Sequence, residues 1–368
     1  MRYRACTLFL VLACMVTTIG CSNVKQLNRI SFITAIGIDK GDSGVIVHAL
    51  IAVPGKFSSL SPGGAGGTEK QSPNYILSKE GTDVAEALFK MKRETARDMN
   101  FGHTRLILFS DELAKEGVDH LFDLFMRREE FQINAWIAIT KGSTKGVLQA
   151  KPEVPQSVND YWVDVFSRAG SDSMEILPIY LYQFYSYLHE PGRTPYAMEI
   201  TTQKEGNELR LTDLGLFRKG KMVGTITPKE TNYLQIISGN RLKSASLTMM
   251  KKNFIVLKYH TKQKITEEGI KLDMSFQIEL DDNPSGASLP LSEMHELESV
   301  IADTLQGDIE RLINKLQKLK TDPAGFGEKY RIAHGGDLQA DEWLESIFPK
   351  LPIHVKVKVS IERKGMLT

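Results

Sequence analysis

Cysteine is nearly absent from this chain of 368 residues: there are three, and none follows residue 21. Cys6 and Cys14 lie in a segment that has the pattern of a secretory leader, so only Cys21 would remain in the mature protein. A single cysteine can form no internal disulfide, which excludes a secreted fold held together by disulfides. We therefore expect a mature chain that depends on hydrophobic cores alone, with a length sufficient for two or three domains.

The amino terminus has the pattern of a bacterial lipoprotein leader. Arg2 and Arg4 form a positive region, residues 5–16 are apolar, and small residues lead up to Gly20 and Cys21. The apolar stretch is too short to span a bilayer core of about 30 Å. We predict a signal peptide over residues 1–20 and lipidation of Cys21 by an S-diacylglycerol and an N-acyl group. The alternative is an ordinary secreted protein in which Cys21 is incidental.

An excess of charge of one sign is also missing. The chain has 46 basic and 45 acidic residues, and cleavage would remove Arg2 and Arg4, which leaves a mature net charge of −1. This balance gives no indication of a polyanionic partner, nucleic acid included. After residue 21 no apolar run approaches the length of about 18 residues that a membrane span requires, so we predict no second crossing.

Catalytic and metal-binding patterns are few. The turn at residues 41–44 resembles the nucleophile segment of trypsin-like proteases, but Gly, Asp and Ser are also the residues of a hairpin turn. His295-Glu296 lacks the second histidine, four residues on, of a helical zinc site. The eight histidines are scattered singly, and the glycines of residues 63–67 follow neither nucleotide-binding pattern. We therefore predict no enzyme activity, no metal site and no cofactor.

Hydrophobic periodicity predicts an α+β fold. Over residues 21–190, strands at 32–39, 45–53, 104–109 and 131–139 alternate with helices, and helices at 157–168 and 176–188 follow. The second of these helices is rich in tyrosine, which suits either a packing surface or a ligand platform. Three prolines and five glycines predict a flexible loop over residues 54–74.

Residues 191–368 have the pattern of a second unit, a sheet with a long helix. Thr227, Pro228 and Glu230 predict a capped helix start, and Gly239 predicts its end. Residues 270–280 alternate strictly between apolar and polar, as in a strand with one wet face. Residues 292–318 carry a broad apolar stripe that would lie on this sheet. The strand at 353–361 alternates too, with basic residues on its outer face.

Several segments together resemble the Ger(x)C lipoproteins, the C subunits of spore germinant receptors. The most specific is Gly102 to Gly117, and further segments similar to this family are residues 35–40, 128–140, 322–327 and 353–365. The resemblance covers essentially the whole mature chain. One departure is the segment after Cys21, residues 22–26, where the family usually has a tryptophan and acidic residues.

The resemblance implies three mixed α/β domains with antiparallel-rich sheets. It implies a non-enzymatic lipoprotein, carrying palmitate or a similar acyl chain, on the outer face of the spore inner membrane. Such a subunit would assemble with two integral-membrane subunits, of A type and B type, and would be needed for nutrient-triggered germination. Gly102, His103 and Arg105 are candidate partner-contact residues. Alternatively, they form a tight turn before a strand, in which His103 and Arg105 cap the turn or pair locally.

Two other classes of function remain as alternatives. A lipid-anchored extracytoplasmic solute-binding protein of a transporter would have two doubly wound lobes, which the alternating strands after residue 250 fit poorly. An extracytoplasmic hydrolase would need the catalytic motifs that the chain lacks.

Overall fold

The computed structural model describes residues 29–52, 74–150, 158–168, 175–202, 209–239, 246–249, 252–266, 268–281 and 291–362. The predicted leader, Cys21 and nearly all of the loop predicted over residues 54–74 lie outside these ranges.

The first part of the chain alternates strands and helices. Its elements are β1 (Ile30–Lys40), β2 (Val45–Ala52), β3 (Asn74–Gly81), α3 (Val84–Glu94), β4 (Asp98–Asn100), β5 (Leu106–Ser110), α4 (Asp111–Glu116), α5 (Asp119–Arg127), β6 (Trp136–Thr140), α6 (Thr144–Gln149), α7 (Val158–Ser167), β7 (Ile179–Tyr180), α8 (Leu181–His189), β8 (Tyr196–Thr202), β9 (Leu209–Arg218) and β10 (Lys221–Ile226).

These strands form one ten-stranded mixed sheet in the order β10-β9-β8-β6-β5-β1-β2-β3, with β4 beside β1 and β7 beside β6. The central strands β1, β5, β6 and β8 are parallel, and β2, β3, β9 and β10 extend the sheet with antiparallel pairs. Every residue of β5 and β6 is buried, because helices cover both faces of a parallel sheet.

The boundary that we predicted between residues 190 and 191 lies between α8 and β8. Strand β8 pairs in parallel with β6, so strands on both sides of that boundary belong to the same sheet. A parallel pair requires a long crossover, and helices α6, α7 and α8 lie within it.

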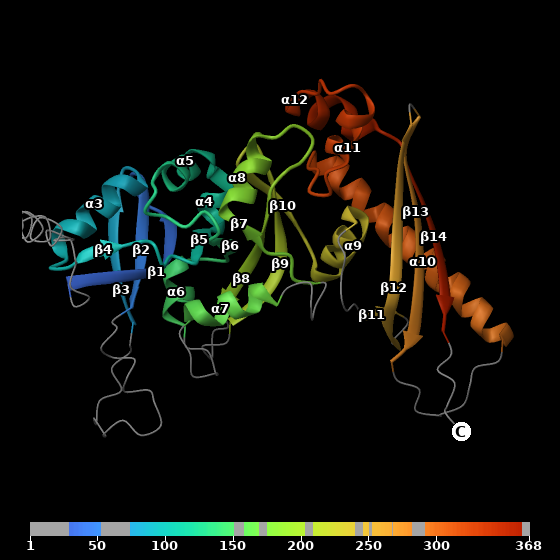
Figure 1. Ribbon diagram of the computed structural model, residues 1–368, viewed down its shortest axis with the longest axis horizontal. Helices are drawn as coiled ribbons and strands as arrows, with labels where there is room; N and C mark the ends of the chain where they lie inside the picture. Colours follow the sequence, from blue (N-terminus) through green and yellow to red (C-terminus); the bar gives the residue numbers. More distant parts are fainter. Residues whose placement is uncertain are drawn as a thin grey trace, which may run out of the picture.

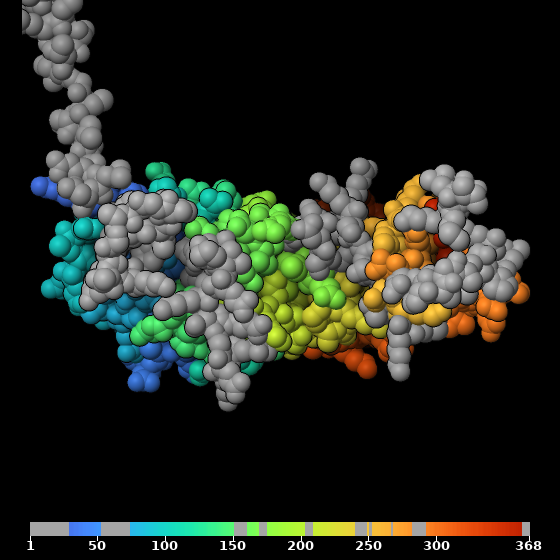
Figure 2. Space-filling view, turned by 90° about the horizontal axis from the view of Figure 1, so that it is seen from below, coloured from blue at the N-terminus to red at the C-terminus, as the bar shows by residue number. Residues whose placement is uncertain are grey.

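The second part of the chain comprises α9 (Pro228–Ser238), β11 (Ser246–Met249), β12 (Lys252–Thr266), β13 (Gly269–Leu280), α10 (Leu291–Leu319), α11 (Phe326–Ala333), α12 (Ala340–Glu342), η3 (Trp343–Ile347), η4 (Phe348–Lys350) and β14 (Ile353–Ile361). Strands β11 to β14 form a second sheet, in which β14 runs parallel to β13. The two sheets lie at opposite ends of an elongated molecule, with α9 between them (Figure 1). Figure 2 shows the same order from below.

Helix α10 packs on the second sheet, as predicted. Its buried side chains contact those of β13 and β14 in one hydrophobic core; they are Ile301, Leu305, Ile309, Leu312, Ile313 and Leu316. Val300, an apolar residue within the same stretch, is 42% exposed. The caps predicted for α9 are confirmed, since Thr227 and Glu230 form a capping box and Gly239 is left-handed. The chain therefore has the predicted mixed α+β fold.

Two predicted elements differ from the structure. Residues 176–180 are not helical, and α8 begins only at Leu181, because Pro178 lacks an N–H and disfavours helix in the residue before it. Residues 179–180 instead form β7, which pairs with β6. The helix predicted after Ser110 is divided into α4 and α5 at Gly117, whose φ of 135° no helix accommodates.

Candidate functional site

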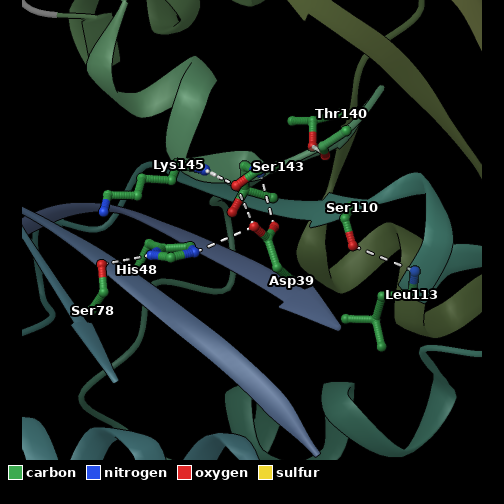
Figure 3. Close-up of polar contacts among 10 residues, drawn as sticks. Asp39, His48, Ser78, Ser110, Leu113, Thr140, Ser143 and Lys145 are labelled. Carbon is green, nitrogen blue, oxygen red and sulfur yellow. Dashed lines mark hydrogen bonds and ion pairs between the residues drawn. The ribbon is translucent and has the colours of Figure 1, made fainter. Parts of the chain in front are cut away.

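A cluster of polar side chains joins the end of β1 to the start of α6 (Figure 3). Asp39 is buried; its Oδ1 accepts a hydrogen bond from the Thr144 N–H at 2.8 Å, and its Oδ2 accepts one from the Ser143 hydroxyl. His48 Nε2 lies 3.3 Å from the same Oδ2, and His48 Nδ1 lies 2.7 Å from Ser78 Oγ. Because an ionised carboxylate can only accept, we assign the ring proton to Nε2, and Nδ1 then accepts from Ser78.

The cluster stabilises ionised Asp39. Burial opposes its ionisation, but the hydrogen bonds that it accepts outweigh burial and hold the pKa of the carboxyl below its usual value. The order Ser78, His48, Asp39 resembles the hydrogen-bond chain of a serine hydrolase. In this protein, however, Asp39 also binds the first N–H of α6, and Ser143 is the N-cap of that helix. The arrangement therefore fastens α6 to β1, and we assign it a structural role.

Gly37 has a related role in the segment at residues 35–40. A Cβ atom on Gly37 would overlap the side chain of Thr144, so only glycine lets α6 approach β1 this closely. The sequence pattern predicts a strand in this segment but does not indicate the roles of Asp39 and His48. The available signal was an acidic residue near the end of an otherwise apolar strand.

The predicted contact residues Gly102, His103 and Arg105 lie in the connection between β4 and β5. The Gly102 N–H donates to Asn100 Oδ1 at 3.0 Å, and the Gly102 carbonyl accepts from Gln132 Nε2 at 2.8 Å. The Arg105 N–H donates to the Thr34 carbonyl of β1 at 3.0 Å. Local hydrogen bonds therefore hold the backbone of this turn against the sheet.

The side chains of this turn contribute to an exposed surface. The His103 ring contacts Phe32 edge-on, with centroids 5.1 Å apart, yet both His103 and Arg105 are exposed. The partner of the His103 ring thus comes from β1 rather than from the turn itself. Gln132, which donates to Gly102, is followed in the chain by Ile133, and the Ile133 side chain is 53% exposed. The Ile133 carbonyl accepts a hydrogen bond from the Tyr182 N–H at 3.0 Å. We call these residues the Arg105 surface: His103, Arg105, Gln132, Ile133 and Tyr182.

An aromatic stack supports this surface. Tyr180 stacks on Trp136 with ring centroids 3.7 Å apart and on Tyr182 at 5.8 Å. Burial raises the pKa of the Tyr180 hydroxyl, and the nearby charge of Arg105 opposes that rise. Tyr182 is 42% exposed at the outer end of the stack. Exposed tyrosine, isoleucine and arginine on a rigid support are typical of protein-binding surfaces.

The predicted carboxyl-terminal signature forms a closed turn around a buried carboxylate. Asp322 Oδ1 accepts hydrogen bonds from the N–H groups of Gly325 and Phe326, at 2.9 and 3.1 Å. Oδ2 accepts from the Gly327 N–H at 2.7 Å and from Trp343 Nε1 at 3.0 Å. Burial raises the pKa of Asp322 to about 6, although the four donors favour the carboxylate.

This turn also joins the two ends of the molecule. The Thr194 N–H donates to the Asp322 carbonyl at 3.0 Å, and the Asp322 N–H donates to Thr194 Oγ1 at 2.9 Å. The Glu328 N–H donates to the Gly192 carbonyl at 3.0 Å. Residues 192–194 precede β8 of the first sheet. We call their contact with residues 322–328 the Asp322 junction. The sequence pattern indicates the turn but not the residues that it contacts.

Cys21, the predicted lipidation site, lies outside the described residues. Within the described ranges, each helix is too short or too polar to cross a membrane. The same part of the chain contains no group of three or more His, Cys, Asp or Glu side chains placed to bind a metal ion.

Two family models match successive parts of the chain. The Spore germination protein N-terminal domain matches residues 23–202, and the Spore germination B3/GerAC like, C-terminal domain matches residues 212–365. The chain belongs to this family of spore germination proteins. The resemblance inferred from residues 102–117 and 322–327 is therefore confirmed.

Similar proteins have the same extent. The putative spore germination protein YfkR of Bacillus subtilis (strain 168) is 25% identical over 382 residues, which cover 97% of this chain and 96% of that protein. Spore germination protein KC of the same organism is 25% identical over 411 residues, 99% of this chain and 97% of that protein. The crystal structure of the GerBC protein has the same fold, with a TM-score of 0.53 and 17% identity over 93% of this chain and 100% of that one.

Proposed function

We propose that this GerAC-family protein is a lipid-anchored, non-enzymatic subunit of a spore germinant receptor. It would lie on the outer face of the spore inner membrane, with Cys21 as its anchor, and would be needed for nutrient-triggered germination. Its partners would be two integral-membrane subunits of A type and B type. The observation that carries the proposal is that spore germination family models match both parts of the chain, from residue 23 to residue 365.

The Arg105 surface is the proposed contact with an integral-membrane partner. Its exposed side chains come from two connections and from α8. Backbone hydrogen bonds of Gly102, Arg105 and Tyr182 hold the surface in place, and the His103 and Tyr182 rings pack against neighbouring rings. The Arg105 side chain has no ion-pair partner among the described residues, which suits it to a carboxylate or an aromatic ring of another chain. Ile133 and Tyr182 would supply the apolar area.

The anchor is tested with Cys21→Ala in cells that lack the partner subunits. Two acyl chains anchor a protein stably, at about 0.8 kcal/mol per buried CH₂, and the described residues contain no membrane-spanning helix. We expect the variant protein to leave the membrane fraction in detergent-free buffer, while the unaltered protein stays. Full membrane retention of the variant would contradict the anchor.

The receptor role is tested by purifying the tagged protein from spore membranes in mild detergent. We expect two integral-membrane proteins to co-purify, and Arg105→Glu to reduce their recovery at least tenfold. Arg168→Glu, at an exposed position after α7, is the matched charge reversal and should leave recovery unchanged. Micromolar nutrient binding by this chain alone, with no co-purified partner, would instead favour a solute-binding protein.

A further inference from the structure

The outer face of the second sheet, opposite α10, is covered by basic side chains. Along β12, β13 and β14, exposed residues on this face alternate with buried or half-buried residues on the other face. We call this the basic face; its exposed residues are Lys258, His260, Lys262 and Lys264 on β12, Lys271, Asp273, Ser275 and Gln277 on β13, and His354, Lys356, Lys358 and Ser360 on β14. Six lysines and two histidines thus share it with the exposed carboxylate of Asp273. Glu279, the next residue on the same side of β13, is buried, and Glu268 and Glu362 lie beyond the ends of the face.

The strand register gathers these charges into rows. Lys264 lies opposite Lys271, which lies opposite His354, so one row across the sheet has three basic residues. In the next row Asp273 separates Lys262 from Lys356. Neighbouring strands are about 4.8 Å apart, and like charges directly opposite each other destabilise a sheet. Because Lys264 lies directly opposite Lys271, the first of these rows does not stabilise the sheet, which points to a ligand.

The lysines of the basic face also lack counter-charges within the protein. None of the six forms an ion pair with another described residue. Lysines on neighbouring elements do pair: Lys315 of α10 lies 2.9 Å from Glu230, and Lys320 contacts Glu345. The basic face is thus a local excess of positive charge on a chain whose total charge is nearly balanced.

We propose that the basic face binds the anionic headgroups of a phospholipid bilayer. Clusters of four to eight basic residues beside a membrane attract anionic lipids, and six lysines lie within that range. The face is a wide sheet surface carrying compact ammonium groups rather than guanidinium forks or aromatic rings. It therefore suits a two-dimensional array of phosphates better than the bases of a nucleic acid or a protein hot spot.

The choice of a bilayer rests on the lipid anchor proposed above. The basic face and β1, the first described strand after Cys21, lie at opposite ends of the molecule (Figure 1). At most about 3.6 Å per residue, the nine steps from Cys21 to Ile30 keep β1 within about 32 Å of the lipid. A second attachment at the far end would lay the long axis along the membrane and fix which side faces the partner subunits.

The effect of each lysine follows from its charge. A lysine beside an anionic bilayer raises the partition coefficient about fivefold, so removal of three should lower it about a hundredfold. The attraction extends over about 10 Å at about 0.1 M salt and about 3 Å at about 1 M, so salt should release the protein.

The test uses the chain from residue 22 onward, which contains every described element and no lipid. It is mixed with vesicles of phosphatidylcholine alone or of equimolar phosphatidylcholine and phosphatidylglycerol, and the bound fraction is measured by flotation. We expect binding to the anionic vesicles only, reversed by about 1 M salt. The triple variant K262Q/K264Q/K356Q should bind about a hundredfold more weakly.

The control variant is K90Q/K145Q/K221Q, which removes the same charge from exposed lysines around the first sheet. It should lose less than fivefold. Equal losses in both triple variants, or binding to neutral vesicles, would overturn the proposal. Salt-sensitive binding to polyglutamate without vesicle binding would assign the face to an acidic protein and would overturn it too. Because this chain carries no lipid, none of these results depends on whether Cys21 is an anchor.

Discussion

Substitution of Gly327 by alanine should weaken the Asp322 junction more than its single methyl group suggests. An added Cβ would lie 2.5 Å from Trp343 Nε1 and closer still to Gly192 Cα. Real Cβ atoms do not approach this closely, so the indole or the backbone must move. The backbone of Gly192 cannot easily move away. Its φ of 97° lies in the region that favours glycine, and it already lies close against the backbone of Gly327 and Glu328.

The magnitude has two parts. Overpacking of a filled interior costs about 1–3 kcal/mol. Displacement of Trp343 removes its hydrogen bond to Asp322, and displacement of Gly192 removes the one that its carbonyl accepts from the Glu328 N–H. A buried polar group left without its partner costs about 1–3 kcal/mol. We therefore expect G327A to lower the free energy of unfolding by about 2–6 kcal/mol out of a total of about 5–15.

Urea unfolding followed by tryptophan fluorescence measures this loss, since Trp343 reports on the junction directly. Gly146→Ala is the matched control, because Gly146 lies inside α6 and its added Cβ would meet nothing within 4 Å. There alanine should stabilise the protein by about 0.4–1 kcal/mol. An unchanged midpoint for G327A would refute the close packing of Gly192, Gly327 and Trp343.

Two further predictions concern α10 and β1. Leu305→Asp places a carboxylate in the core between α10 and the second sheet and should lower the free energy of unfolding in urea by several kcal/mol. Val300→Asp, at an exposed position of the same helix, should lower it by under about 1 kcal/mol. Equal small losses would contradict the packing of α10. The lowered pKa of Asp39 means that its contribution to stability is present above about pH 4 and is lost as the pH falls through the pKa of the folded state. As the pH falls below about 4, Asp39→Asn should therefore lose less stability than the unaltered protein, and parallel acid unfolding curves would contradict this.

Local patterns were sufficient for much of the fold. The capping box and Gly239 define α9, the apolar stripe of residues 292–318 predicts α10, and strict alternation predicts the strand at 270–280. In each case the deciding interactions join residues within a few positions of one another, or within one face of one element. The segments that resemble germination proteins also predicted the family, because they are read directly from the chain.

Other features of the fold depend on partners far away in the sequence. Residues 179–180 form a strand because β6 offers an edge to pair with, and β8 to β10 continue the first sheet because β8 pairs with β6. Tertiary structure alone brings His48 to Asp39 and Gly192 to Gly327.

The net charge could be read from the sequence, but the distribution of charge over the surface could not. Composition alone reported a nearly neutral chain and indicated no polyanionic partner. The basic face exists because the registers of β12, β13 and β14 place six lysines between residues 258 and 358 on one side of the sheet, with Asp273 as its one exposed carboxylate. A sum of charges is a property of the sequence, but the field of a surface depends on the distances between charges, and only the folded sheet sets those distances.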